Sequence, residues 1–209
     1  YCENFLHMMF GNEDGQSIQN KKGELVCKKP FPSMPVKFWN DNKNEKYISA
    51  YFKKFENIWH HGDFAKINKI GEFVIFGRSD TTLNPGGVRL GTSEIYSVVE
   101  KFKEIQESIV IGQSWNNDIR IILFIVLNKG YTLTEEIKDK IKKEIRANAS
   151  PRHIPSKIIP ILEIPKTKNG KLVELAVKQS IEGEEIKNLE AIANPDSLKQ
   201  FKNIKELNE

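Results

Sequence analysis

Charged residues and glycines of this 209-residue chain occur together in patterns that suit a nucleotide or phosphate ligand. The stretches that carry them are His61-Gly62-Asp63, Gly77-Arg78-Ser79-Asp80, Gly86-Gly87-Val88-Arg89 and Asn169-Gly170-Lys171. A carboxylate offers two acceptor oxygens, which can take both hydroxyls of a ribose. Arginine and lysine supply cations for phosphate oxygens, and glycine lets a backbone approach a ligand where a Cβ would clash.

Each stretch also has an ordinary structural interpretation. A Gly-Asp pair usually stabilises a turn, so Asp63 can serve that purpose alone, and Arg78 can form a surface ion pair. The pair Gly86-Gly87 can be a simple turn. Residues 165–171 resemble a hairpin with Asn-Gly at its tip, which explains the tip but not the presence of Lys171. The ordered set of stretches, rather than any one of them, favours the ligand-binding interpretation.

The charge and cysteine content argue against several classes of protein. The formal net charge is +4, and lysines alternate with acidic residues in the last third of the chain, which gives little support to nucleic-acid binding. Cys2 and Cys27 are too few for a disulfide framework and form no Cys-x-x-Cys motif. No apolar run approaches the roughly 20 residues that span a bilayer, and the first residues do not resemble a signal peptide. We therefore expect a cytoplasmic protein that has no membrane partner.

Histidines could suggest a metal or a general base. His60 and His61 are adjacent, and successive side chains of a strand point to opposite faces, so these two cannot readily share one metal ion. We therefore predict structural roles for them, for His7 and for His153, and no metal site.

The distribution of aromatic residues divides the chain near position 80. Of the 20 Phe, Trp and Tyr residues, 14 lie before that position, so residues 1–79 and 80–209 are expected to have different packing partners. In the first segment, residues 23–28 and 71–77 have the composition of strands bounded by glycine. The first segment is therefore predicted to be a β-rich subdomain.

The second segment predicts alternating helices and strands, as in a small α+β domain. A helix is expected after Gly91, with Thr92 or Ser93 as its N-cap. A second helix is expected over residues 134–146 behind a threonine cap, and the apolar run 119–127 suits a buried strand.

The last part of the chain predicts one more helix and a tail. Residues 172–181 place Leu172, Leu175, Ala176 and Gln179 on one helical stripe. Residues 193–209 are polar enough that we expect the tail to be partly loose. The whole chain is thus assigned to the α+β class.

The sequence resembles the C-terminal part of an acyl-CoA synthetase, a member of the adenylate-forming ligases, from about position 10 to its end. The Pro-Ser-Met-Pro and Trp-His-His-Gly-Asp elements point to the branch that activates acetoacetate rather than acetate. The resemblance rests on Gly23-Glu24-Leu25-Val26, Pro30-Phe31-Pro32-Ser33-Met34-Pro35-Val36, Trp59-His60-His61-Gly62-Asp63-Phe64-Ala65, Gly77-Arg78-Ser79-Asp80, Leu83-Asn84-Pro85, Gly87-Val88-Arg89, Ser93-Glu94-Ile95-Tyr96, Arg152-His153-Ile154-Pro155, Asn169-Gly170-Lys171, Val173-Glu174, Ala176-Val177-Lys178-Gln179 and Asn194-Pro195.

The resemblance implies a reaction in two half-steps. Acetoacetate attacks ATP in the presence of Mg²⁺ to give an acyl-adenylate and pyrophosphate, and the thiol of coenzyme A then displaces AMP. Asp63 would hold the ribose hydroxyls, Arg78 the ribose and phosphate side, and Arg89 a phosphate of the nucleotide. Lys171 would bridge the substrate carboxylate and the α-phosphate in the first half-step, where it would stabilise developing negative charge.

The resemblance also implies a hinge between the half-steps. Asp80 occupies the family's hinge position, where a few backbone torsions would swing the second segment as a lid. Lys171 would then leave, and the loop of Gly86 and Gly87 would line the path of the coenzyme A thiol.

A large part of such an enzyme is absent from this sequence. The family's phosphate loop, adenine pocket and most of its acyl pocket lie in a larger N-terminal domain, of which residues 1–79 would be the last β-rich subdomain. We expect the chain to be an inactive fragment whose partner is that missing domain. Six aromatic residues could then be exposed where the domain packs: Phe31, Phe38, Trp39, Phe52, Phe55 and Trp59.

Two other functions stay open. The acid could be another short one, such as acetate, because the acyl pocket lies outside this chain. The chain could also be a free-standing, lid-like module that binds a nucleotide or a partner without catalysis, since it carries no phosphate loop.

Overall fold

The computed structural model describes residues 8–11, 21–68, 70, 72–81, 83–88, 90–186 and 188–208. It divides into two compact units, Tyr1–Asp80 and Thr81–Glu209. The described elements of the first unit are β1 (Met8–Gly11), β2 (Gly23–Cys27), α1 (Glu45–Tyr51), β3 (Trp59–Ile67) and β4 (Phe73–Arg78). Those of the second are η1 (Pro85–Gly87), α2 (Thr92–Val99), β5 (Ile105–Trp115), β6 (Asp118–Leu127), α3 (Glu135–Asn148), η2 (Pro151–His153), β7 (Lys157–Pro160), α4 (Glu174–Glu182), η3 (Leu189–Ala191), η4 (Pro195–Phe201) and η5 (Lys205–Leu207). The predicted α+β class is confirmed.

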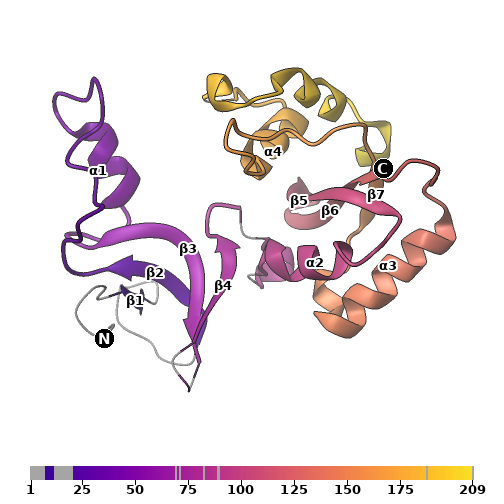
Figure 1. Cartoon of the computed structure of the whole chain (residues 1–209), viewed down its shortest axis with the longest axis horizontal. Coiled ribbons are helices and arrows are strands. Elements are labelled where there is room, and N and C mark those ends of the chain that lie inside the picture. The colour runs from indigo at the N-terminus through magenta and orange to yellow at the C-terminus, as the bar shows by residue number, and fades with distance from the viewer. Residues whose placement is uncertain are drawn as a thin grey trace. The chain divides into compact units, whose positions relative to one another are not determined.

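The first unit is built on an antiparallel sheet with the strand order β1-β2-β3-β4 (Figure 1). All five residues of β2 are buried, and β3 lies beside it as the longest strand of this sheet. The strands predicted from residues 23–28 and 71–77 correspond to β2 and β4, although Gly71 lies outside the described residues. The pairing of β3 with β4 places Asp63 directly opposite Arg78.

Aromatic residues of the first unit pack mainly on one another. The ring of Trp59 stacks on Tyr51 of α1 at 3.7 Å between centroids, and Phe31 and Phe52 meet it edge-on at 5.3 and 5.9 Å. Trp59 is consequently 5% exposed. The expectation of exposure is wrong for Trp59 and Phe55, because α1 and its flanking loops cover this end of β3.

The other aromatic residues of that prediction differ among themselves. Trp39 is 97% exposed, as expected. Phe31, Phe38 and Phe52 are half-buried, and Phe38 contacts the rings of Tyr47 and Tyr51.

The second unit has a sheet with the strand order β5-β6-β7. Strands β5 and β6 form an antiparallel hairpin whose two turn residues, Asn116 and Asn117, both have positive φ, as a type I′ turn requires. Strand β7 is parallel to β6, and α3 forms the crossover between them. Figure 1 shows α2 and α3 on one side of this sheet and α4 with the C-terminal segment on the other.

Strand β6 is the centre of the core because both of its faces are buried. Ile121, Leu123 and Ile125 pack with residues of α2 and α3, whereas Ile122 and Phe124 pack with α4 and the tail. An uninterrupted apolar run is the expected sequence of such a strand. The buried strand predicted from residues 119–127 is confirmed.

The helix predictions are confirmed, with one correction at an N-cap. Thr134 caps α3 by accepting a hydrogen bond from the backbone N–H of Ile137, as predicted. The N-cap of α2 is Gly91 rather than Thr92 or Ser93, and the side chain of Glu94 accepts a hydrogen bond from its N–H at 3.1 Å. Among the described residues, no helix combines the length and hydrophobicity that crossing a bilayer requires.

The predicted stripe of the last helix is only partly buried. Leu172 and Leu175 are 37% and 45% exposed, whereas Ala176 of the stripe is buried together with Val177 and Ser180. The buried face of α4 packs against the tail, because Val177 belongs to the same cluster as Leu198 and Phe201.

The tail is packed rather than loose, which contradicts the prediction from its polarity. Leu198, Phe201 and Leu207 are each at most 3% exposed. The ring of Phe201 meets Phe124 of β6 edge-on at 5.0 Å between centroids. Only every third or fourth tail residue is apolar, which suits a chain of short 3₁₀ helices with one buried side, and this sparse pattern resembles that of a solvated tail.

The packing of the tail predicts a large effect of a single truncation. Phe201→Ala should destabilise the second unit by about 3–5 kcal/mol, because it leaves a cavity against Phe124. Denaturant unfolding measures this free energy. Lys199→Ala, in the same tail and highly exposed, is the matched control and should change stability by less than about 0.5 kcal/mol. A loose tail would make both variants equally stable.

Candidate functional site

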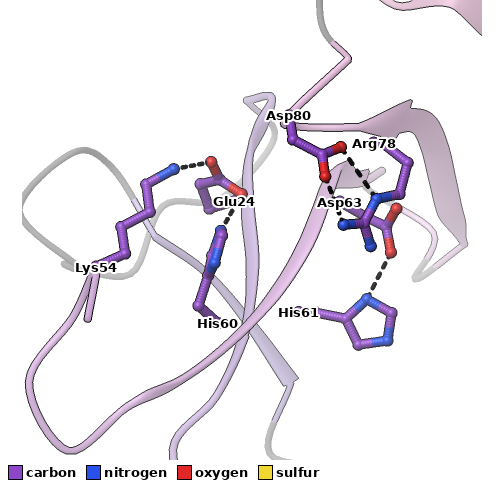
Figure 2. Close-up of polar contacts among 7 residues, drawn as sticks. All are labelled: Glu24, Lys54, His60, His61, Asp63, Arg78 and Asp80. Carbon is purple, nitrogen blue, oxygen red and sulfur yellow. Dashed lines mark hydrogen bonds and ion pairs between the residues drawn. The ribbon is translucent and has the colours of Figure 1, made fainter. Parts of the chain in front are cut away.

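Asp63 and Arg78 form the centre of the polar group on β3 and β4. Their Cα atoms are register partners in the antiparallel pairing, so both side chains stand on the same face of the sheet. Nδ1 of His61 lies 2.5 Å from Oδ2 of Asp63 and donates a hydrogen bond to it (Figure 2). His61 thus orients the carboxylate of Asp63, which lies beside the guanidinium of Arg78.

Arg78 forms a bidentate ion pair with Asp80. Its Nε donates to Oδ1 of Asp80 at 3.1 Å and its Nη2 donates to Oδ2 at 2.8 Å (Figure 2). These hydrogen bonds raise the pKa of the guanidinium, an effect that partial burial opposes and that the charges of Asp63 and Glu24 reinforce. Both side chains of the pair are about half exposed, so the pair can open at a low cost, about 0–1 kcal/mol.

Gly62 provides the space in which this guanidinium lies. A Cβ at position 62 would come within 3.1–3.3 Å of three guanidinium atoms of Arg78. Gly62 also has a φ of +86°, and its carbonyl accepts a hydrogen bond from the N–H of Ser79 at 2.9 Å. A side chain at position 62 would therefore be strained by the backbone conformation and would require the guanidinium of Arg78 to shift by a few tenths of an ångström.

A second polar group of the first unit was not predicted from the sequence. Glu24 is 3% exposed, and its carboxylate binds Nε2 of His60 at 3.0 Å and the ammonium group of Lys54 (Figure 2). Burial raises the pKa of Glu24, but the hydrogen bonds and charges of His60 and Lys54 outweigh burial and hold that pKa below its usual value. The only local signal was an acidic residue inside an otherwise buried strand, which does not identify its partners.

The loop of Gly86 and Gly87 is held at both ends. Both glycines have positive φ, +57° and +76°. The N–H of Gly86 donates to both carboxylate oxygens of Asp118, at 2.9 and 3.0 Å. Hydrogen bonds from the backbone N–H groups of Ile119 and Gly86 lower the pKa of Asp118, so the acceptor is an ionised carboxylate over the physiological range.

The base of the same loop is a short bridge. Leu83 and Leu90, both buried, exchange two backbone hydrogen bonds of 3.1 and 2.8 Å. Among the described residues, apart from the chain neighbours of Gly87, no atom lies within 4 Å of the position of a Cβ on Gly87, which borders an open hollow of about 640 Å³ beside Trp115. The loop thus presents glycine backbone to open space. Arg89 lies outside the described residues, so the structure does not test its assignment.

Lys171 lies on an exposed hairpin, as the Asn-Gly sequence predicted. Lys166 and Leu172 are antiparallel bridge partners, and Gly170 has a φ of +76° at the turn. The N–H of Thr167 donates to the carbonyl of Lys171 at 2.8 Å, and Oγ1 of Thr167 accepts from the N–H of Lys171 at 3.1 Å. Within the described part of the chain, the ammonium group of Lys171 has no hydrogen-bond partner.

Tyr96, a half-buried residue, connects the hairpin to the rest of the unit. The hydroxyl of Tyr96, on α2, donates to Oε1 of Glu174 at 2.5 Å and accepts from the N–H of Val110 at 3.0 Å. Burial, followed by the negative charge of Glu174, raises the pKa of Tyr96 well above its usual value. Glu174 is the first residue of α4, three positions after Lys171, so this contact fixes the far side of the hairpin.

The histidines bind carboxylates or hydroxyls. His60 and His61 face Glu24 and Asp63, and buried His153 contacts Glu94 and Ser150 at 3.2 and 2.8 Å. In the described ranges, no three His, Cys, Asp or Glu side chains are grouped to hold a metal ion. His7 lies outside those ranges.

The comparisons with known proteins agree with the predicted resemblance to acyl-CoA synthetases, which is confirmed. Residues 94–171 match the model of the AMP-binding enzyme C-terminal domain. The chain is 53% identical over 196 residues to acetoacetyl-coenzyme A synthetase of Rhizobium meliloti (strain 1021), and 48% identical over 198 residues to acetoacetyl-CoA synthetase of Xenopus tropicalis. Each alignment covers 94% of this chain.

A solved structure extends the similarity to the fold. Acetoacetyl-CoA synthetase from Streptomyces lividans matches 98% of the chain with a TM-score of 0.89 and 37% identity. The chain spans about 30% of the length of each of these three proteins. The similarity therefore concerns one part of a longer enzyme in each relative.

The environment of Glu24 predicts how stability depends on pH. Because its pKa is lower in the folded state than the ordinary 4.5, Glu24 stabilises the fold above that pH, and this contribution is lost as the pH falls through the lowered value. Glu24→Gln should cost about 1–3 kcal/mol at pH 7 and should reduce the loss of stability on acidification. Denaturant unfolding at pH 7 and below pH 4 measures both effects. The exposed Glu56→Gln is the control, and equal pH dependence in all three proteins would contradict the assignment.

Proposed function

We propose that this chain, whose residues 94–171 match the model of the AMP-binding enzyme C-terminal domain, is part of an ATP-dependent acid–thiol ligase that forms acetoacetyl-CoA. Acetoacetate is the proposed acid because the named relatives at 48% and 53% identity are acetoacetyl-CoA synthetases. The observation that carries the proposal is the opposition of Asp63 and Arg78 across β3 and β4. It brings an acceptor pair for ribose hydroxyls next to a planar cation for phosphate oxygens.

The proposed reaction has two half-steps. An oxygen of the acetoacetate carboxylate bonds to the α-phosphorus of ATP, and pyrophosphate leaves with the electrons of the broken bond. The sulfur of coenzyme A then loses its proton to the solvent and bonds to the acyl carbon, and the bond between that carbon and the phosphate oxygen breaks, so AMP leaves with the electrons of that bond. Mg²⁺ is proposed to arrive with ATP as a counterion of its phosphates, and we assign it no ligands from the described residues.

The first unit is proposed to hold the nucleotide. Asp63 accepts from the ribose hydroxyls, and its hydrogen bond with His61 fixes the carboxylate for that contact. Arg78 faces the ribose and the phosphates, and Gly62 gives it room. Arg89 is proposed as a further phosphate contact from the sequence resemblance alone.

Lys171 is proposed as the catalytic residue of adenylate formation. Its exposed position on a short, hydrogen-bonded hairpin supports this role, because a cation that must reach an incoming carboxylate and the α-phosphate needs a free ammonium group on a fixed support. Two other lysines lie on the same hairpin. Lys166 forms an ion pair with Glu107, and Lys168 is exposed.

The second half-step is proposed to use the loop of Gly86 and Gly87 as the path of the thiol. The open space at Gly87 and the clamp from Asp118 on Gly86 support this role. Asp80 is the proposed hinge. Asp80 accepts two hydrogen bonds from Arg78, which is also the proposed contact for the nucleotide. A nucleotide that draws Arg78 away would therefore release Asp80.

The assignment of Lys171 predicts a selective loss. In the complete protein, Lys171→Ala should lower the rate of adenylate formation by about 10²–10³ and leave thioester formation from supplied adenylate largely intact. Pyrophosphate release and thioester formation are measured separately. Lys168→Ala, on the same hairpin, should change neither rate, and equal loss of both half-steps in Lys171→Ala would refute the role.

The choice of acid is tested in the same assay. Pyrophosphate release by the complete protein should be fastest with acetoacetate when acetate, acetoacetate and butyrate are compared. A ranking in which acetoacetate comes last would favour another short-chain acid. No pyrophosphate release with any acid would favour a binding module without catalysis.

The clamp on the glycine loop predicts an effect on the second half-step. Asp118→Asn retains one acceptor oxygen but loses the charge and the second acceptor, so the KM for coenzyme A should rise by about three- to tenfold with adenylate formation unchanged. Asp139→Asn, on the exposed face of α3, is the control. A slower adenylation with unchanged KM would count against the proposed thiol path.

A further inference from the structure

The segment that leads into the lysine hairpin obtains hydrogen bonds from side-chain amides of the tail. Gln200 accepts from the N–H of Leu162 at 2.9 Å and donates to the carbonyl of Glu163 at 2.6 Å. Asn194 accepts from the N–H of Lys166 at 2.9 Å and donates to the carbonyl of Ile164 at 3.1 Å. A carboxamide carries the same donor and acceptor as a peptide unit, so each amide replaces part of a neighbouring strand.

The backbone of the tail continues this pairing onto the hairpin itself. Ala193 donates to the carbonyl of Lys166 at 2.8 Å, and Lys168 donates to the carbonyl of Ala191 at 3.1 Å. Thr167 and Ile192 are bridge partners, while Lys166 bridges to Leu172 on its other side. The first arm of the hairpin is therefore bonded along both edges.

Asn194 is itself held by the core. Its carbonyl accepts from Oγ of Ser197 at 2.6 Å, and the next residues form η4, which buries Leu198 and Phe201. Oγ of Ser180, on α4, donates to the carbonyl of Leu198 at 3.0 Å. The amide of Asn194 thus connects the buried 3₁₀ helix to the exposed hairpin.

These contacts come from residues beyond the part of the chain that matches the AMP-binding C-terminal domain, which ends at residue 171. We propose that residues 188–208 position the catalytic lysine and that Asn194 is the positioning residue. The inference rests on the proposed role of Lys171. The ammonium group of Lys171 has no partner of its own among the described residues. The position of the hairpin backbone therefore determines where this group can reach a ligand. Misplacing a reacting group by about 1 Å can cost on the order of 10²-fold in rate, so a loosened hairpin slows the step that uses Lys171.

The first experiment compares the half-reactions of the complete protein. Asn194→Ala should lower the rate constant of adenylate formation by about tenfold at saturating ATP and acetoacetate, with KM values and thioester formation from supplied adenylate unchanged. Asn194→Asp keeps the acceptor for Lys166 and loses the donor to Ile164, so its rate should be intermediate. Asn208→Ala, an exposed amide of the same tail, is the control and should match the wild type. Equal loss in both half-reactions would overturn the positioning role.

The second experiment needs no activity. Hydrogen exchange of the peptide that spans residues 164–172 should be about five- to tenfold faster in Asn194→Ala than in Asn208→Ala, because hydrogen bonds that restrain this segment are lost. Unchanged exchange overturns the inference whatever the enzyme does. If exchange accelerates but adenylate formation keeps its rate in a protein in which Lys171→Ala abolishes it, the positioning role is also refuted. If Lys171→Ala leaves adenylate formation intact, the proposed function of Lys171 fails, and so does a positioning role that depends on it, while the exchange result still reports whether the tail restrains the hairpin.

Discussion

The second unit depends on one strand that is buried on both faces. Ile121, Leu123 and Ile125 on one face of β6 hold α2 and α3, and Ile122 and Phe124 on the other hold α4 and the tail. Each part of the candidate site in this unit is attached to that strand. Asp118, the first residue of β6, binds the glycine loop, and the segment after its parallel partner β7 leads into the lysine hairpin. The apolar layers therefore fix the site as well as the fold.

Elements with a strong local signal could be predicted from the sequence. The apolar, β-branched run 119–127 suited a buried strand, Thr134 had both the residue type and the position of an N-cap, and the Asn-Gly pair before Lys171 had the composition of a tight turn. In each case the residues that specify the element lie within it, so no knowledge of distant contacts was needed. Strand β5 has only a short apolar run, from Ile109 to Ile111, and was not predicted from the sequence.

Features that depend on distant partners could not be predicted. Trp59 is buried because α1 brings Tyr51 onto its ring, and Phe201 is buried because it meets Phe124 from a separate part of the chain. The sequence indicated Asp63 and Arg78 separately. It did not indicate that they oppose each other, because the register of β3 and β4 includes a bulge between Phe64 and Ala65. The interpretation of the tail failed for a related reason, since its few apolar residues matter only once β6 and α4 offer a surface.

Gly62 contributes to the candidate site because it has no side chain. The guanidinium of Arg78 occupies the volume that any side chain at this position would begin to fill, 3.1 Å from the first carbon. Asp80 binds this cation, and Gly62 leaves room for it although it offers the cation neither charge nor side-chain hydrogen bond. A redesign of this sheet that kept every polar residue but treated position 62 as an ordinary strand residue would keep the charged groups and change the position of Arg78 relative to Asp63.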